Sequence, residues 1–231
     1  DRPLLGRELV LRRARGYAPL PVHCKQPIPN SLAVGAHLKN TVALTVGENV
    51  FVSQHIGDLE NKEASDAFQE VIRSFRSLYR IDPSHVVADM HPDYISTKFA
   101  RESGIPMISV QHHYAHVAAC MAENELEGRV LGVSWDGTGY GTDGTVWGGE
   151  FLLTDETGFT RIASFRKFRL PGSASAVKEP RRAALGVLYE IFGNGAFEKE
   201  LAPILSFGKR DIHLLAQMLQ KGIQSPWTSS A

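Results

Sequence analysis

Apolar and polar residues alternate along three short runs in the first quarter of the chain. The runs cover residues 31–38, 41–46 and 49–55. Asn40 and the Gly47-Glu48 pair fall at the breaks between them, where tight hairpin turns belong. Over residues 62–80 the apolar positions change to helical spacing, and Asp82-Pro83 ends that pattern. This order predicts three antiparallel strands followed by an amphipathic helix.

Short strands and helices then alternate along the chain. The pattern predicts strands at 85–90, 106–111 and 129–136, and helices at 94–103 and 113–126. The order βββαβαβα gives an α/β fold, a mixed five-stranded sheet with helices on its faces. That is the ribonuclease-H-like unit, which actin-like ATPases (the ASKHA fold) contain in duplicate.

A second copy of the opening pattern begins near Arg129. Strand 130–135 is expected to enter a glycine-rich turn at 136–144 and to return through 145–153, with a third strand over 160–168. Three helices follow. They are expected at 183–192, 196–205 and 211–221.

The expected organisation has three parts. Residues 1–30 are an extended leader or linker, and residues 31–128 form the first ribonuclease-H-like unit. Residues 129–231 start a second unit that carries a helical insertion and is incomplete at its C-terminal end. Because the chain starts without Met and stops just after a helical region, we expect it to be a piece of a longer protein.

The composition is that of an ordinary soluble globular protein, with 43% hydrophobic and 22% charged residues. The 25 basic residues balance the 25 acidic ones, which gives no general attraction to DNA or to an acidic membrane. Cys24 and Cys120 form no C-x-x-C pair, so neither a zinc ribbon nor a disulfide framework is expected. The sequence has no signal peptide and no apolar run of the ~20 residues that span a bilayer, and a reducing cytoplasm is the default.

The sharpest chemical motif is an H-x-x-x-H pair, His112 and His116, at the start of a predicted helix. This spacing puts both imidazoles on one helical face, within reach of one cation. Asp136, at the end of a later strand, is the candidate third ligand. Two imidazoles and one carboxylate leave coordination positions open, which suits a reactive site. The alternative is a helix start that merely carries several histidines.

Two segments between strands could bind phosphate through backbone amides, residues 35–41 and residues 136–139. In the first, the candidates are Lys39, Asn40 and Thr41. In the second, they are Gly137, Thr138 and Gly139. Neither segment is a Walker loop, and two hairpin turns that need Gly and Asn for their backbone angles are the alternative.

Two further clusters leave the choice open. The segment Asp89-Met90-His91-Pro92-Asp93 ends a strand at the sheet edge of His112, so it could bind substrate or support that histidine. Equally, its two aspartates could cap the helix near Tyr94. The segment Lys178-Glu179-Pro180-Arg181-Arg182 could bind phosphate or carbamate, or could be a solvated helix face.

Taken together and in order, the motifs of this chain resemble the HypF family of hydrogenase maturation proteins. The segments that carry the likeness are Leu11–Pro19, Gly35–Thr41, Ser53–Leu59, Asp89–Pro92, His112–His116, Trp135–Gly141, Trp147–Glu150 and Leu170–Gly172. The likeness as a whole covers nearly the whole chain. Antibiotic O-carbamoyltransferases and the enzymes that threonylcarbamoylate tRNA share the fold, but the basic run at 12–17 favours HypF over both.

The resemblance implies a carbamoyl transfer. In HypF, ATP and carbamoyl phosphate give a carbamoyl-adenylate in a separate YrdC-like domain. The domain that resembles this chain passes the carbamoyl group to the C-terminal cysteine thiolate of HypE, on the way to the cyanide ligands of nickel-iron hydrogenase. By the same likeness, His112, His116 and Asp136 are ligands of an iron or zinc ion. Lys39 and Gly137–Gly139 are phosphate contacts, and no residue of the chain is the nucleophile.

The chain also departs from the family. Ser173-Ala174 replaces a Gly-Asp pair whose acidic group could hold a ribose, and Arg181 replaces a Trp. The other domains of HypF and a fourth metal ligand are expected outside residues 1–231, so the isolated chain is expected to be inactive. The alternative functions are a carbamoyltransferase of a sibling class, acting on a small hydroxyl compound or tRNA, and a nucleotide-binding scaffold without turnover.

Overall fold

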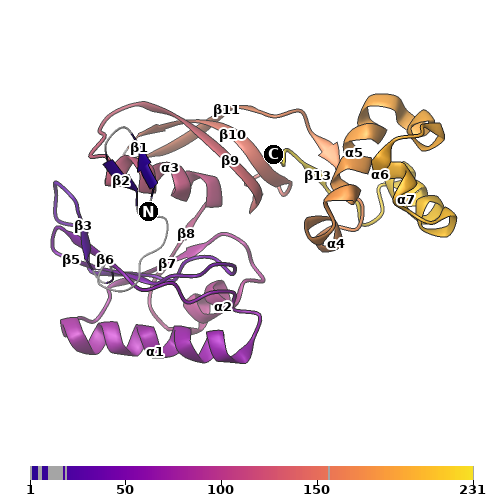
Figure 1. Ribbon diagram of the computed structural model, residues 1–231. Coiled ribbons are helices and arrows are strands. Elements are labelled where there is room, and N and C mark those ends of the chain that lie inside the picture. The colour runs from indigo at the N-terminus through magenta and orange to yellow at the C-terminus, as the bar shows by residue number, and fades with distance from the viewer. Residues whose placement is uncertain (1, 5–6, 10–17, 19, 156, 231) are drawn as a thin grey trace. The chain divides into compact units, whose positions relative to one another are not determined.

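The computed structural model describes residues 2–4, 7–9, 18, 20–155 and 157–230, and it divides into two compact units (Figure 1). Unit 1 is Asp1–Glu127 and unit 2 is Gly128–Ala231. The basic run at 12–17 lies outside the described residues. Within the part that is described, no helix has both the length and the apolar character needed to cross a bilayer.

Unit 1 is built on a six-stranded mixed sheet. Its strands are β3 (Pro21–His23), β4 (Ser31–Ala33), β5 (Ala43–Val46), β6 (Asn49–Val52), β7 (His85–Asp89) and β8 (Met107–Val110). Their order is β3-β6-β5-β4-β7-β8, with β4, β5 and β6 antiparallel and with β7 and β8 parallel to β4. The predicted mixed sheet is therefore confirmed, although its first strands are shorter than the apolar runs suggested.

Part of the segment 1–30, which was predicted to be an extended leader or linker, joins the sheet. Residues Pro21–His23 form β3, which adds a sixth strand by antiparallel pairing with β6. A three-residue strand that begins with proline is too short to show alternation, so the pattern could not identify it. Nearer the N-terminus, β1 (Arg2–Leu4) and β2 (Arg7–Leu9) pair as a separate antiparallel ribbon.

Three helices complete unit 1: α1 (Lys62–Tyr79), α2 (Ile95–Glu102) and α3 (His112–Glu123). Asn61 caps α1 by accepting a hydrogen bond from the backbone of Ala64, and Arg80 ends it in the left-handed conformation. Phe68 and Ile72 of α1 and Ala100 of α2 join the core of the sheet. Both helices lie on the same side of the sheet (Figure 1). Burial of each large side chain contributes about 1.5–3 kcal/mol.

The parallel pairing of β7 and β8 positions the chemistry of unit 1. Asp89, the last residue of β7, is the register partner of Val110, the last residue of β8. Just beyond them, the backbone of Met90 donates to Val110 at 3.0 Å. Because parallel strands emerge at the same edge, the residues that follow them, including His112, lie beside Asp89.

Unit 2 contains a smaller sheet. Its strands are β9 (Val130–Tyr140), β10 (Val146–Asp155), β11 (Gly158–Ser164), β12 (Phe168–Arg169) and β13 (Trp227–Thr228). β9, β10 and β11 are antiparallel neighbours, whereas β13 runs parallel to β10 and pairs antiparallel with β12. The strand-turn-strand-strand pattern predicted near Arg129 is therefore present.

The glycine-rich turn predicted at 136–144 begins later than expected. β9 continues through Tyr140, and the reversal lies at Gly141–Thr145, where the backbone of Gly141 donates to Thr145. The β9–β10 register shifts between Trp147, which is paired with Gly139, and Gly149, which is paired with Trp135. Three residues of β9 thus face one of β10, an irregularity that period-2 alternation does not reveal.

The helical part of unit 2 leaves the sheet after β12 and returns to it at β13. It consists of α4 (Ala174–Lys178), α5 (Pro180–Phe192), the 3₁₀ turn η1 (Gly193–Glu198), α6 (Ala202–Leu205) and α7 (Lys209–Lys221). The helix predicted at 196–205 is wrong, because the segment breaks into η1 and α6. Two glycines, at 193 and 195, weaken helical order there. Leu185, Ile204, Leu215 and Leu219 form a core of their own.

A buried ion pair holds the sheet of unit 2 together. Glu150 of β10 is 0% exposed, and the Arg161 guanidinium of β11 donates to its Oε2 at 2.6 Å. The backbone of Gly148 and the hydroxyl of Ser229 donate to Oε1. Arg161 also lies over the Trp147 ring, 4.1 Å from its centroid. The carboxylate therefore links two strands with the residue that follows β13.

Glu150→Ala is expected to lower the free energy of unfolding by about 3–5 kcal/mol, because Arg161 loses its buried partner. Urea unfolding of the 231-residue chain measures this loss. Glu200→Ala, at an exposed position, is the control and should change stability by no more than about 0.5 kcal/mol. Equal stability of the two variants would show that the buried pair contributes nothing net.

Asp143 should make the stability of unit 2 pH-dependent. Burial alone would raise the pKa of its carboxyl group, but hydrogen bonds from Thr145, Trp147 and Lys167 outweigh that effect and lower the pKa well below the ordinary 3.8. A depressed folded-state pKa gives stability that is complete above pH 3.8 and is lost as the pH falls toward the folded-state value. Asp143→Asn should therefore be less stable than wild type near neutral pH, with a difference that narrows in acid. The urea midpoints of wild type and Asp143→Asn, compared from neutral to acid pH, measure this stability difference. A difference that does not change with pH would contradict the lowered pKa of Asp143.

Candidate functional site

The histidine-rich motif opens α3 directly at the edge of the unit 1 sheet. Gln111, which follows β8, caps the helix because its Oε1 accepts a hydrogen bond from the backbone of Tyr114 at 2.9 Å. The helix therefore starts at His112, one residue before the predicted start. His113 is fully buried, and its Nδ1 lies 3.2 Å from the Gln111 amide. His113 thus belongs to the interior, in line with its omission from the predicted ligands.

His112 and His116 lie one helical turn apart with their rings close together. Their Nε2 atoms are 3.2 Å apart, and the ring planes meet at 86°. Two nitrogens that bind one zinc ion at about 2.0–2.1 Å, with an angle of roughly 100–110°, would be separated by about 3.1–3.4 Å. The observed separation therefore suits two imidazole ligands of a single cation.

The other side of the His112 ring faces a carboxylate. Nδ1 of His112 lies 2.7 Å from Oδ2 of Asp89. An ionised carboxylate only accepts, so Nδ1 carries a proton, and in the neutral ring the lone pair is then on Nε2, 3.2 Å from Nε2 of His116. Metal-binding histidines commonly have this arrangement, in which a carboxylate orients the ring.

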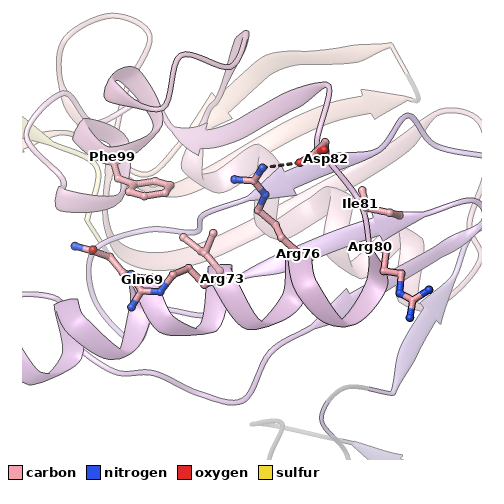
Figure 2. A pocket seen from close by; sticks show the side chains of 8 residues that line it. Gln69, Arg73, Arg76, Arg80, Ile81, Asp82 and Phe99 are labelled. Atoms are coloured by element: carbon pink, nitrogen blue, oxygen red, sulfur yellow. Dashed lines mark hydrogen bonds and ion pairs between the residues drawn. The ribbon is translucent and has the colours of Figure 1, made fainter.

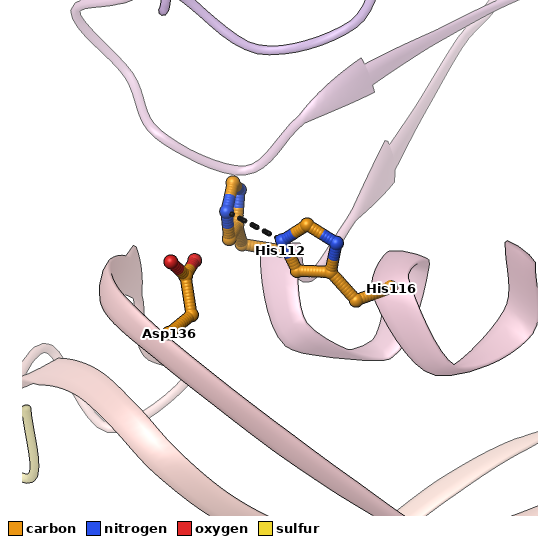
Figure 3. Close-up of side chains that lie close together, drawn as sticks. All are labelled: His112, His116 and Asp136. Atoms are coloured by element: carbon orange, nitrogen blue, oxygen red, sulfur yellow. Dashed lines mark hydrogen bonds between the residues drawn. The ribbon is translucent and has the colours of Figure 1, made fainter. Parts of the chain in front are cut away.

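Asp136 belongs to unit 2, where it lies in the irregular stretch of β9. Its Oδ1 accepts a hydrogen bond from the backbone of Gly137 at 2.7 Å. Figure 3 shows the side chains of the three predicted ligands, His112, His116 and Asp136. The donor set fits a divalent transition metal such as zinc or iron.

Asp89 does not cap a helix, which overturns the capping alternative for this residue. The N-cap of α2 is Tyr94, and no side chain makes a cap hydrogen bond there. Oδ1 of Asp89 instead accepts from the backbone of His91 at 2.8 Å, while Oδ2 faces His112. The sequence placed Asp89 at the correct edge, and the predicted parallel strands were the signal that could have paired it with His112.

The segment after β7 is ordered by stacked rings. His91 stacks on Tyr94 with centroids 4.1 Å apart and an interplanar angle of 5°, and Tyr94 stacks on His37 at 5.4 Å. Burial lowers the pKa of His91, and the nearby carboxylates of Asp89 and Asp93 oppose that shift only in part. The stack therefore joins two of the sequence motifs, one around His37 and one around His91.

The first predicted phosphate segment, residues 35–41, forms a tight loop between β4 and β5. Gly35 has a φ of +65°, and a Cβ there would come within 2.6 Å of the Thr41 carbonyl. The buried Asn40 amide donates to the Val34 and Ala36 carbonyls at 2.8 and 2.6 Å. Asn40 therefore braces the loop from inside.

Lys39 occupies an unusual backbone position in this loop. Its φ is 51°, a left-handed backbone conformation that few residues other than glycine adopt easily. The backbone N–H of Lys39 donates to Oδ1 of Asp58 at 2.8 Å, and the residue is exposed. The backbone of Lys39 is thus held at the loop surface by the Asp58 side chain.

The second predicted phosphate segment, Gly137–Gly139, lies inside β9, so its description as a turn is wrong. Gly139 pairs with Trp147 of β10, and Gly137 and Thr138 lie in the irregular stretch. Both predicted phosphate segments nevertheless occur where the first strand of a repeated pattern leads into the second. Backbone N–H groups in an irregular strand are not all used by ladder pairing.

Within the basic cluster Lys178–Arg182, both arginines are paired with an acidic residue of the same segment. Glu179 forms ion pairs with Arg181 at 2.7 Å and with Arg182 at 2.9 Å. Arg181 also donates to the Ser206 carbonyl and lies over the Phe207 ring. These contacts favour the structural interpretation over an anion site.

A pocket of about 590 Å³ lies along α1, away from the histidine motif in sequence (Figure 2). Its lining includes Arg73, Arg76 and Phe99. Arg76 is paired with Asp82 at 2.6 Å, and Arg73 with Glu70 at 2.8 Å. Two of the guanidinium groups that line the pocket are therefore ion-paired, and none of the predicted metal or phosphate residues lines it.

The fold and the comparison with known proteins define the class to which this chain belongs. A mixed sheet of ribonuclease-H topology followed by a second strand-turn-strand-strand unit is the actin-like ATPase fold. Two family models match, "HypF Kae1-like domain" over residues 26–123 and "Carbamoyltransferase, Kae1-like Domain, second subdomain" over residues 132–231. The chain belongs to the HypF family.

Relatives from distant organisms agree with this assignment. The chain is 43% identical to the carbamoyltransferase HypF of Synechocystis sp., a match over 97% of the chain and 31% of the relative. It is 33% identical to the probable carbamoyltransferase HypF of Methanocaldococcus jannaschii, over 97% of the chain and 30% of the relative. The chain thus spans about a third of the length of the curated relatives it matches.

Solved structures give the same result. A crystal structure of full-length HypF in its phosphate- and nucleotide-bound form matches with a TM-score of 0.88 and 43% identity, over 95% of this chain and 34% of that one. The crystal structure of T. kodakarensis HypF matches with a TM-score of 0.87 and 36% identity, over 100% of this chain and 32% of that one. The predicted fold class is therefore confirmed.

Asn40→Ala should destabilise the chain by about 1–3 kcal/mol, because the carbonyls of Val34 and Ala36 lose their side-chain donor in a buried loop. Urea unfolding measures the loss. Asn194→Ala, at an exposed position, removes one surface hydrogen bond to Gln220 and serves as the control. If Asn40→Ala is no less stable than this control, the loop does not depend on the bracing amide.

Proposed function

We propose that this region transfers a carbamoyl group from carbamoyl-adenylate to the C-terminal cysteine thiolate of HypE. In that role it serves the synthesis of the cyanide ligands of nickel-iron hydrogenase. The observation that carries the proposal is the pair of imidazoles on α3, whose Nε2 atoms lie 3.2 Å apart within a HypF-family fold. The names of the relatives, carbamoyltransferase HypF, support the reaction class.

His112, His116 and Asp136 are proposed to hold one divalent cation, iron or zinc. The fit rests on donor chemistry, on the 3.2 Å separation of the two Nε2 atoms and on the contact of His112 Nδ1 with Asp89, which orients the ring. Three protein ligands leave coordination positions open to a substrate. When bound, such an ion polarises a carbonyl group and stabilises negative charge on its oxygen.

Acyl transfer to a thiol also requires groups that bind and stabilise the leaving group. The carbamoyl carbon must be attacked by sulfur, and the leaving group is the phosphate of AMP. Lys39 and Thr41, together with the backbone of residues 137–139, are proposed to bind that phosphate. Cationic and N–H donors there would stabilise the charge on the departing oxygen. Lys39 suits this part because its backbone is fixed while its side chain lies at the loop surface.

The nucleophile is proposed to come from HypE, so no internal nucleophile is required. Cys24 and Cys120 are free thiols without an assigned role in transfer. ATP and carbamoyl phosphate would be consumed by other domains of the longer HypF protein, in the cytoplasm. Residues 31–128 and the segment from 129 would then act as the two units of the transfer domain.

His116→Ala is expected to reduce Zn²⁺ binding by the 231-residue chain and to lower carbamoyl transfer at least about 100-fold in a full-length HypF-family protein that carries this region. Transfer is measured by mass spectrometry of a HypE tail, supplied with or without its terminal cysteine. Only the tail that ends in cysteine should be modified.

His213→Ala is the matched control, because this histidine of α7 is exposed and its Nε2 lies 3.0 Å from the Gln217 side-chain amide. It should leave both readouts unchanged. Full transfer by His116→Ala would overturn the metal site, and carbamoylation of the tail without cysteine would overturn the thiol as acceptor.

A further inference from the structure

We infer that Asp89 is the positioning residue that makes His112 a metal ligand. The inference rests on the metal site of the proposed function and extends it to a residue outside the ligand set. Asp89 would act through His112: its carboxylate would fix both the ring orientation and the nitrogen that carries the proton. The chemistry at the cation would then depend on a residue that never touches it.

The carboxylate of Asp89 is buried, and each of its oxygens has a hydrogen-bond contact. Its side chain is 5% exposed, and its two oxygens have different partners. The backbone N–H of His91 donates to Oδ1 at 2.8 Å, and Nδ1 of His112 donates to Oδ2 at 2.7 Å. Because one oxygen is fixed by a backbone group, the other has a defined direction, and that direction leads to the imidazole.

The support beneath Asp89 is rigid. The hydroxyl of Thr97 donates to the Asp89 carbonyl at 3.0 Å in a buried contact, which ties the end of β7 to α2. The backbone of Asp93 donates to Nδ1 of His91 at 3.2 Å, and the His91 ring stacks on Tyr94. The residue that fixes Oδ1 is therefore itself fixed from two sides.

This arrangement selects one tautomer of His112. With the proton on Nδ1, the lone pair is on Nε2, 3.2 Å from Nε2 of His116. A proton on Nε2 instead would block ligation by that nitrogen. Without its carboxylate, the ring would also be free to rotate about its side-chain bonds. Loss of such an orienting group commonly weakens metal affinity about 10–100-fold.

Asp89→Asn is the discriminating variant, because it has the same shape and can keep both hydrogen bonds. Its Oδ1 can still accept from the His91 backbone, but its amide then donates to His112 and reverses the direction of that bond. The proton of His112 should move to Nε2. The opposite amide orientation would point two donors at each other at His91.

Two readouts on the 231-residue chain test the inference. Nitrogen NMR, at a pH where imidazole is neutral, should show His112 protonated on Nδ1 in wild type and on Nε2 in Asp89→Asn. Competition with a chromogenic chelator should show Zn²⁺ affinity reduced about 10–100-fold in Asp89→Asn. Urea unfolding should show that the variant remains folded. Asp89→Ala, which has neither hydrogen bond, should also lose affinity.

The matched control is Asp93→Asn, an exposed aspartate of the same segment. It should keep the wild-type tautomer and affinity. Equal Zn²⁺ affinity and an unchanged tautomer in Asp89→Asn would overturn the role of Asp89 and leave the metal site standing. A wild-type chain that binds no Zn²⁺ would instead overturn the proposed metal site itself.

Discussion

The parallel pairing of β7 with β8 is the constraint on which the site in unit 1 depends. Strands that run in the same direction end at the same edge, and their register sets Asp89 opposite Val110. The buried carboxylate and the first turn of α3 are thereby brought together, although His112 lies 23 positions after Asp89 in the sequence. A register slip of one residue would turn Asp89 to the other face of the sheet.

The sequence predicted an element correctly where the pattern of apolar or ligand residues was set by local helical spacing. Helix 62–80 was predicted nearly to its observed ends because seven apolar positions repeat at helical spacing and Asp82-Pro83 stops them. The H-x-x-x-H pair was recognisable because its spacing by itself puts two side chains on one face. The actin-like fold followed from the order of elements and is supported by the solved relatives.

The missed features depend on contacts between distant residues. β3 is held in place by its pairing with β6, and three residues carry no pattern of their own. β9 was cut short because glycines at 137 and 139 suggest a turn, whereas pairing with β10 carries the strand through them. The role of Asp89 was left open for the same reason: a cap and a carboxylate that orients a histidine look alike until the partner is known.

The two histidines of α3 differ in exposure, and this difference suits the proposed metal site. His112 is 18% exposed and is held by a buried carboxylate, whereas His116 is exposed on the next turn. A ligand oriented before binding reduces the ordering cost when a cation arrives. In the proposed site, the exposed His116 would leave its side of the cation accessible to solvent and substrate. His112, whose tautomer matters for the proposed site, is therefore the histidine held by a buried carboxylate. The more accessible histidine, His116, lies one helical turn away.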